Sequence, residues 1–442
     1  MYQDLNRETY PDPYSLHHLD TTRDVALNDC IANSQYQQIL DVLPSKPILD
    51  ALIESFFSDI SHHYSIINTP HFIQQYVRWS TNTEQEQYQD AELTILILMI
   101  CACVTQQLPR DGAIQAGNSS SLEYHSAGQR LAMTLPAGSH SLTNLQWKLL
   151  SISWFQGEAR FIEAWHTIGL AIQEAYELGY HEVQTRTAIS RTEAQIGRQI
   201  WRVLHCWNWQ LSLTLGRPMI MNDIDSEPDM EVDPKMTSPS PTLSTKLQYQ
   251  LISSLAKRWH TPHRIDSPSE IHAHTELIEG YMRSVPTVYN INETDTSKDH
   301  TWPWLISHRY YIQAMTYFMI LQPYKTCLSN SAIDLMLPHV QKMREEAVRY
   351  CLKALDVASQ WSSHALDGDM HFHLVVLCLF DTAAFLGTTL ARNEMHQQKD
   401  KVKAALSHAT TALQQLGRTS QGAKTSHILL VRILKGAADK TK

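Results

Sequence analysis

The sequence lacks the cysteine patterns that hold metal ions or disulfides. Its seven cysteines are odd in number, contain no C-x-x-C pair and lie mostly among apolar residues. Cysteine-rich zinc sites and disulfide frameworks both depend on such spacings. We therefore expect reduced, packed thiols and no structural zinc at Cys30, Cys101, Cys103, Cys206, Cys327, Cys351 and Cys378.

Basic runs are also missing. The formal net charge is −9, and the densest groups of cations are KRWHTPHR at 257–264 and KDKVK at 399–403. Neither provides the stripe of several cations on one face that neutralises phosphates along a nucleic acid. The chain alone is therefore predicted not to bind nucleic acid.

Long hydrophobic segments are absent as well. The longest apolar run is LTILILMICACV at 93–104, and a helix needs about 20 such residues to span a bilayer. The sequence does not open with a charged region followed by an apolar one, the pattern of a secretory signal. We expect no membrane contact, and we interpret 93–104 as a central helix buried on all sides.

Catalytic signatures are missing too. The sequence contains no G-x-S-x-G, glycine-rich phosphate loop, H-E-x-x-H or Walker pattern. The histidine pairs at 260–263, 272–274 and 371–373 lack the acidic partner of a catalytic zinc site. These observations favour a protein without catalytic residues, metal or cofactor, although an enzyme that only orients a reactive substrate would need no conspicuous motif.

Helical periodicity is what the sequence offers instead. It has only 15 glycines, and 43% of its residues are hydrophobic, which favours long helices with buried faces and an all-α fold without significant sheet. Six acids and no base lie between 223 and 233, which is typical of a solvated loop. The predicted parts are a loosely ordered arm at 1–45, a helical core at 46–222, an acidic and Pro/Ser-rich linker with a variable middle segment at 223–300, and a C-terminal helical block packed on the core at 301–442.

The stretch WRVLHCWNWQLSLTLGRP at 201–218 combines three tryptophans with a histidine and a cysteine. Its apolar residues recur at helical spacing around most of the surface, which predicts a helix buried on most sides. Gly216 can take the left-handed conformation that ends a helix, and Pro218 prevents a restart. We interpret the tryptophans and His205 as core residues.

The preceding stretch, AWHTIGLAIQEAYELGYHE at 164–182, has the pattern of an amphipathic helix. Gly169 would let a partner helix approach closely, and Gly179 would end the helix. The two predicted faces are Trp165, Ile168, Gly169, Ile172 and Tyr176 on the apolar side, and Glu163, Thr167, Gln173, Glu174 and Glu177 on the polar side.

Four blocks in order resemble one known family. They are FFSDISHHYSIINTPHFIQQY, AWHTIGLAIQEAYELGYHE, IWRVLHCWNWQLSLTLGRPMIMNDID and HRYYIQAMTYFMILQPYK. Together they resemble the middle homology region of fungal binuclear zinc cluster transcription factors, over most of the chain from about residue 48. The resemblance implies an all-α, multi-helix regulatory domain without assigned catalytic residues, acting in the nucleus on catabolic or secondary-metabolite genes.

The sequence also departs from that family. The family reads DNA with an N-terminal cluster of six cysteines that holds two zinc ions, but here only Cys30 precedes Cys101. Where relatives usually carry an arginine and then an Asp-Arg pair, this chain has Gln173, Asn208 and Trp209. If those charges pair across two helices in relatives, their joint loss avoids leaving one buried charge unpaired.

Two functions remain open at this stage. The first is a regulator without its own zinc cluster, which acts in the nucleus through the transcription machinery or a DNA-binding partner; a small-molecule inducer and a homodimer are compatible with it. The second is a repurposed member, in the cytoplasm, that binds or converts a small apolar metabolite in its helical interior. The polar residues expected around such an interior ligand site are His166, Gln173, His205 and Asn208.

Overall fold

The fold was described from a computed structural model of the chain. It covers residues 36–81, 90–107, 120–136, 138, 140–182, 190–221, 239–259, 265, 267–290, 294–329, 337–365, 372–390, 398–418 and 420–439. These residues form helices and their connections, and no strand occurs among them. The predicted all-α fold is confirmed. The acidic run at 223–233, Cys30 and the histidine pair at 260–263 lie outside these residues.

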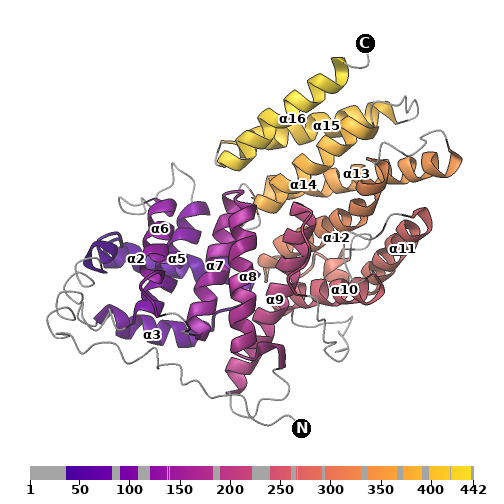
Figure 1. Ribbon diagram of the computed structural model, residues 1–442. Coiled ribbons are helices and arrows are strands. Elements are labelled where there is room, and N and C mark those ends of the chain that lie inside the picture. The colour runs from indigo at the N-terminus through magenta and orange to yellow at the C-terminus, as the bar shows by residue number, and fades with distance from the viewer. Residues whose placement is uncertain are drawn as a thin grey trace, which may run out of the picture.

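The N-terminal helices pack around α5 (Figure 1). Every residue of α5 from Leu93 to Val104 is buried, as the unbroken apolar run predicts. The elements of this half of the chain are α2 (Lys46–Ser55), η1 (Phe56–Ile60), η2 (Ser61–His63), α3 (Thr69–Thr81), α5 (Ala91–Gln107), α6 (Ser121–Ala132), α7 (Leu142–Gly157), α8 (Phe161–Glu177) and η3 (Tyr180–Glu182).

The remaining helices build a second hydrophobic core. In Figure 1 they run from α10 through the orange α13 to the yellow α16. They are α9 (Arg191–Leu215), α10 (Leu243–Trp259), α11 (Pro268–Ser284), η4 (Thr287–Tyr289), α12 (Trp304–Leu328), α13 (Pro338–Ala365), α14 (Phe372–Phe385), η5 (Leu386–Leu390), α15 (Lys399–Leu416) and α16 (Gln421–Asp439). The helices α10 and α11 lie within the predicted middle segment 223–300, and they supply buried side chains to this core.

Helix α9 belongs to both cores and lies between α8 and α10 in Figure 1. Its residues Trp207 and Leu211 pack in the N-terminal core, whereas Cys206 and Trp209 pack in the C-terminal core. A helix with apolar groups around its whole circumference can be buried on opposite sides by two partners. The predicted burial of 201–215 is therefore confirmed, and α9 joins the two halves.

Helix α9 begins after a serine cap and ends at the glycine that the sequence indicated. The Ser190 side chain accepts a hydrogen bond from the Glu193 backbone N–H, and Gly216 has a φ of 62°. The φ of Gly179, after α8, is 68°. Both glycine positions confirm the predicted helix ends. The expectation for Gly169 is wrong, because a Cβ there would meet only the Cδ1 of Ile220 at 3.5 Å and no neighbouring helix.

A matched pair of glycine substitutions should separate backbone strain from packing. A Cβ at Gly216 or at Gly436, within α16, would meet nothing within 4 Å. Gly216→Ala should therefore lower the free energy of unfolding by about 1 kcal/mol through the left-handed backbone alone. Gly436→Ala should raise it by about 0.5 kcal/mol, because alanine favours the helix. Urea denaturation of both variants measures this, and equal signs would contradict it.

The described cysteines are free and buried: Cys101, Cys103, Cys206, Cys327, Cys351 and Cys378. Burial raises the pKa of Cys103, Cys351 and Cys378 to about 12. The expectation of packed, unpaired thiols is confirmed for these six. Over the same described stretches, no cluster of metal-ligand side chains is present, and no helix is both long and apolar enough to cross a bilayer.

Two buried histidines should make the fold sensitive to acid. Burial, aided by the Arg160 charge, lowers the pKa of His125 to about 3, and burial alone lowers the pKa of His274 to about 4. In the unfolded chain a histidine takes up its proton near pH 6.5. Protonation therefore favours unfolding, so this stability is complete above about pH 6.5 and is lost as the pH falls toward 4.

The acid effect can be measured at one of these histidines. Between pH 7.5 and 5.5, His274→Gln should lose about 1 kcal/mol less stability than the natural protein, since its titration is removed. His272→Gln is the matched control, because His272 lies on the same helix with its side chain 63% exposed. Urea denaturation at both pH values gives the free energies of unfolding that test this prediction. An equal loss in all three proteins would contradict the assignment.

Candidate functional site at the junction of the two cores

The segment after α2 takes an irregular path toward the second core. The helix continues as a π-helical turn at Phe56–Ile60 and a 3-10 turn at Ser61–His63, and Ser65 then has a φ of 50°. A π turn shifts the helical register by inserting a residue, and a positive φ is rare outside glycine. Such features cluster at functional sites. We refer to residues 61–67 as the junction strap.

Two buried glutamines hold the junction strap. Gln199 Nε2 of α9 donates to the Tyr64 carbonyl over 2.8 Å, and Gln146 Nε2 of α7 donates to the Ile66 carbonyl over 2.8 Å. A loop buried against helices leaves carbonyls that water cannot reach, and these amides satisfy two of them. The strap is therefore a fixed part of the interior.

Histidines from both cores meet at the strap. His63 is 4% exposed and His308, on α12, is 1% exposed. Their ring centroids are 5.3 Å apart, and Trp304 lies 4.9 Å from His308. On the other side, Tyr64 packs edge-on against Trp207 of α9 at 4.8 Å. The strap thereby connects the second core, through α12, with the shared helix α9.

A small cavity remains between these groups. Its free volume is about 10 Å³, which is about the space of one water molecule. The Tyr311 hydroxyl donates to Gln248 Oε1 over 2.8 Å at its wall. The lining comes from the strap (His63, Tyr64), α9 (Val203, Cys206, Trp207), α10 (Ser244, Thr245, Gln248) and α12 (His308, Tyr311).

The chemistry of this cavity favours structural coupling over catalysis. Burial raises the pKa of Cys206 far above its usual value, and the Arg202 charge offsets this only in part. A thiol in that state is not a nucleophile. The cavity is also too small for a metabolite. The strap, α9, α10 and α12 all line this cavity, and both cores share these contacts. A rearrangement of one core can therefore be transmitted to the other through them.

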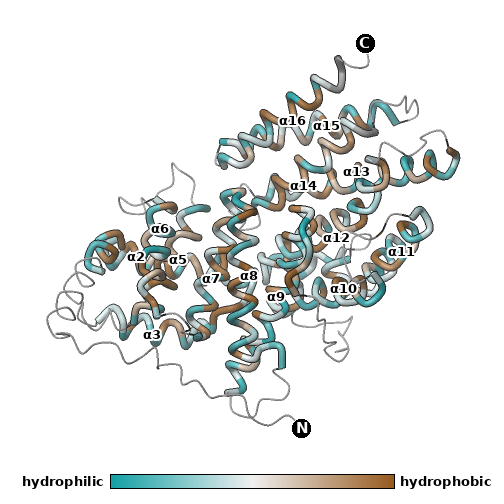
Figure 2. Tube along the Cα trace, viewed as in Figure 1, coloured by the Kyte–Doolittle hydropathy of each residue, from teal (hydrophilic) through white to brown (hydrophobic). Residues whose placement is uncertain are grey.

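The four residues predicted around an interior ligand site differ in exposure. His166 and Gln173 are exposed on α8, whereas His205 and Asn208 are buried on α9. In Figure 2, hydrophilic and hydrophobic residues alternate along α8, as expected of a helix with one face in water. Two of the four residues are therefore at the surface and two are in the interior. That any one of them binds a ligand stays a prediction.

The two buried residues have structural surroundings. Asn208 Nδ2 donates to the Met221 carbonyl over 3.3 Å, and its Oδ1 accepts from the Ile220 N–H over 3.1 Å. It thereby ties the segment after Gly-Arg-Pro to α9. The His205 ring lies edge-on between Trp201 and Tyr249. Position 173 is exposed and position 208 is buried, and the pairing of charges at these positions in relatives stays a prediction.

Glu174 is the buried carboxylate that the sequence pattern missed. It was predicted on the polar face of its helix, yet its side chain is 4% exposed. It accepts from Lys148 Nζ at 2.5 Å and from Asn144 Nδ2 at 2.8 Å, and the Ser141 N–H donates to it at 3.4 Å. These partners all lie at the start of α7, so the contact holds α8 against α7.

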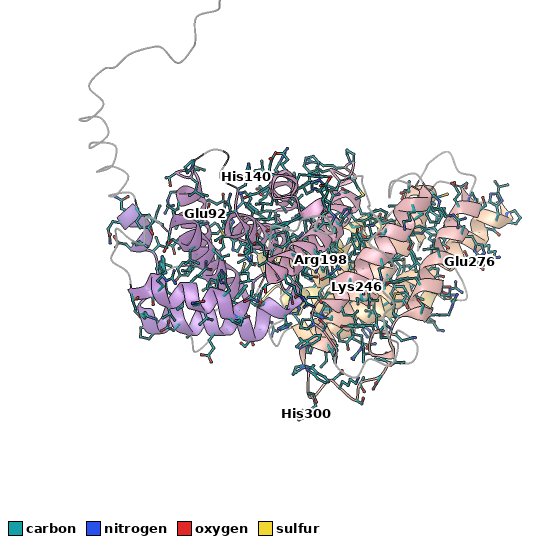
Figure 3. The ribbon with its side chains drawn as sticks, turned by 90° about the horizontal axis from the view of Figure 1, so that it is seen from below. Glu92, His140, Arg198, Lys246, Glu276 and His300 are labelled. Carbon is teal, nitrogen blue, oxygen red and sulfur yellow. The ribbon has the colours of Figure 1, made fainter. Side chains whose placement is uncertain are left out.

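The junction histidines were also missed as a group. His62 and His63 stand in the first family-like block, and His308 opens the last one. The adjacent histidines 62 and 63 inside an apolar segment could have indicated a buried polar site. The sequence does not show, however, that this segment packs against α12. Figure 3 shows the labelled Arg198 and Lys246 in the middle of the molecule, where α9 and α10 meet, with Glu92 and Glu276 toward its two sides.

The described structure is thus an all-helical domain with two cores, a shared central helix and buried, unactivated polar groups at the junction. Residues 53–302, more than half of the chain, match the family described as the fungal specific transcription factor domain. The chain therefore belongs to that family. The match contains the strap and α9 and ends before α12.

Curated relatives agree with this family. The probable transcription factor sol4 of Alternaria solani is 26% identical over 261 residues, which cover 56% of this chain and 46% of the relative. The transcription factor xilB of Penicillium rubens is 22% identical over 303 residues, covering 61% and 44%. The transcription factor FBD3 of Gibberella moniliformis is 32% identical over 83 residues, covering 19% and 11%. The chain matches less than half the length of these relatives.

Proposed function

We propose that this chain is the regulatory part of a fungal transcription regulator and that it controls a metabolic or secondary-metabolite gene set from the nucleus. The observation that carries this proposal is the family match over residues 53–302, together with relatives named as transcription factors. The junction supports it, because a contact shared by two cores suits a protein that changes conformation.

DNA contact is proposed to come from a partner. The chain carries a net charge of −9, and its basic residues are scattered, so phosphate binding by these residues alone is unfavourable. The proposed partners are proteins of the transcription machinery or a DNA-binding protein. Binding of a small-molecule inducer and self-association are compatible modes of control.

A strain that lacks the gene tests this function. Coordinated loss of several transcripts is the expected result, measured beside a metabolite profile of the same cultures. Normal transcripts with accumulation of one intermediate would contradict the proposal and would support the other function, conversion of a small apolar metabolite. The junction cavity does not favour that alternative, because it holds about a single water molecule. A second cavity, on the N-terminal core, does not favour it either, because its lining is mainly polar and charged.

Reintroduced variants then test the junction. His308→Leu should keep the protein folded while altering the transcripts, because leucine fills much of the space of the buried imidazole without its polar atoms. His300→Leu is the control, since His300 is exposed and lies at the edge of the molecule in Figure 3. Protein levels by immunoblot must be equal. Unchanged transcripts with His308→Leu would remove the junction from the regulatory mechanism.

A further inference from the structure

A second cavity, of about 370 Å³, lies on the N-terminal core. This volume is within the range of small-molecule sites. Three parts of the chain line it. These are α3 (Gln75, Arg78), Asp90 with the first turn of α5 (Ala91, Glu92, Leu93), and the segment after α6 with the start of α7 (Leu135, Pro136, Thr143). The cavity lies away from the junction, and Figure 3 shows Glu92 on that side of the molecule.

Hydrogen bonds fix the walls of this cavity. Thr94 of α5 accepts from Trp79 Nε1 of α3 over 2.9 Å and pairs with the Tyr36 hydroxyl at 3.0 Å. The Ser141 hydroxyl bonds to Glu92, and the same oxygen accepts from the Asn144 N–H at the start of α7 over 2.9 Å. Since both neighbouring helices are tied to α5, the site is largely formed before anything binds, which lowers the entropic cost of binding.

The charges of the lining define its ligand. Among the described residues, the charged groups of the lining are one guanidinium, of Arg78, and two carboxylates, of Asp90 and Glu92. The complementary molecule carries two cationic groups and one anionic group. We propose that this cavity binds a basic α-amino acid of the lysine class, with its carboxylate at Arg78 and its two ammonium groups at Asp90 and Glu92. Gln75 and Thr143 offer further polar contacts.

Other ligand classes fit the lining less well. An anion such as phosphate would be repelled by two carboxylates against one guanidinium. A purely apolar molecule would desolvate three charged groups without pairing them. A divalent cation is disfavoured because the described side chains form no cluster with the geometry of a metal site. The inference concerns binding alone and stands whether or not the chain regulates transcription.

Calorimetric titration of the purified full chain tests the site with three probes. L-lysine is expected to bind with a dissociation constant on the order of 0.1 mM, because the site is partly open to water. Cadaverine lacks the carboxylate and L-norleucine lacks the side-chain ammonium, so each should bind about tenfold more weakly. No heat with L-lysine up to about 10 mM, a hundredfold excess over that constant, would overturn the proposal.

Three variants assign the contacts. Arg78→Gln should weaken L-lysine about tenfold and leave cadaverine unchanged, whereas Asp90→Asn should weaken both. Arg130→Gln is the control, because Arg130 is an exposed arginine on α6 outside the lining. Arg78 is exposed and Asp90 is half-buried, so both variants should fold, as thermal unfolding would check. Lysine binding that is equal in all three variants would overturn the site.

Discussion

Lys148→Met should destabilise the protein by about 3 kcal/mol, because it leaves the Glu174 carboxylate buried without its cation. The side chains of Lys148 and Glu174 are 14% and 4% exposed, and their charged atoms lie 2.5 Å apart. Asn144 Nδ2 and the Ser141 N–H would still donate to the carboxylate, so part of its solvation is retained. Urea denaturation of the natural protein and the variant measures the loss.

Two controls separate this effect from the loss of a lysine as such. Lys46→Met removes an exposed ion pair with Asp50, whose side chains are 53% and 47% exposed, and should cost less than about 0.5 kcal/mol. The double variant Lys148→Met with Glu174→Gln removes both charges and should recover most of the stability. The interpretation fails if the buried and the exposed lysine variants lose the same amount.

Trp207→Ala should cost about 4 kcal/mol and should loosen the N-terminal core, while Trp209→Ala should cost a similar amount and loosen the C-terminal core. Both side chains are 3% exposed, but Trp207 packs against Tyr64 of the strap and Trp209 belongs to the other core. The comparison is closely matched, because the two residues stand two positions apart on the same helix.

Hydrogen exchange followed by mass spectrometry distinguishes the two variants. Exchange should accelerate mainly in α2, α3 and α5 for Trp207→Ala, and mainly in α10 and α12 for Trp209→Ala. Equal acceleration in both halves, with one unfolding transition, would show that the two cores unfold as a single unit. In that case the junction would not let one core rearrange independently of the other.

The sequence by itself determined the features that depend on local chemistry. The apolar run at 93–104 is buried on every side because it contains no polar residue that could face water except Thr94, whose hydroxyl is bonded to Tyr36 and Trp79. The end of α9 followed from Gly216, since glycine adopts a positive φ without strain. The family followed from ordered blocks of residues.

Only the tertiary structure decided which helix faces meet and what lies between them. Periodicity placed Glu174 with the polar residues of α8, but the start of α7 supplies Lys148 and Asn144 to it, so the carboxylate is buried. His166 and Gln173, on the same helix, are exposed to water. His63 and His308 meet because a π turn and a 3-10 turn redirect the chain toward α12. A sequence pattern gives the period of a helix, whereas the partner that buries each face is fixed by packing between segments far apart in the chain.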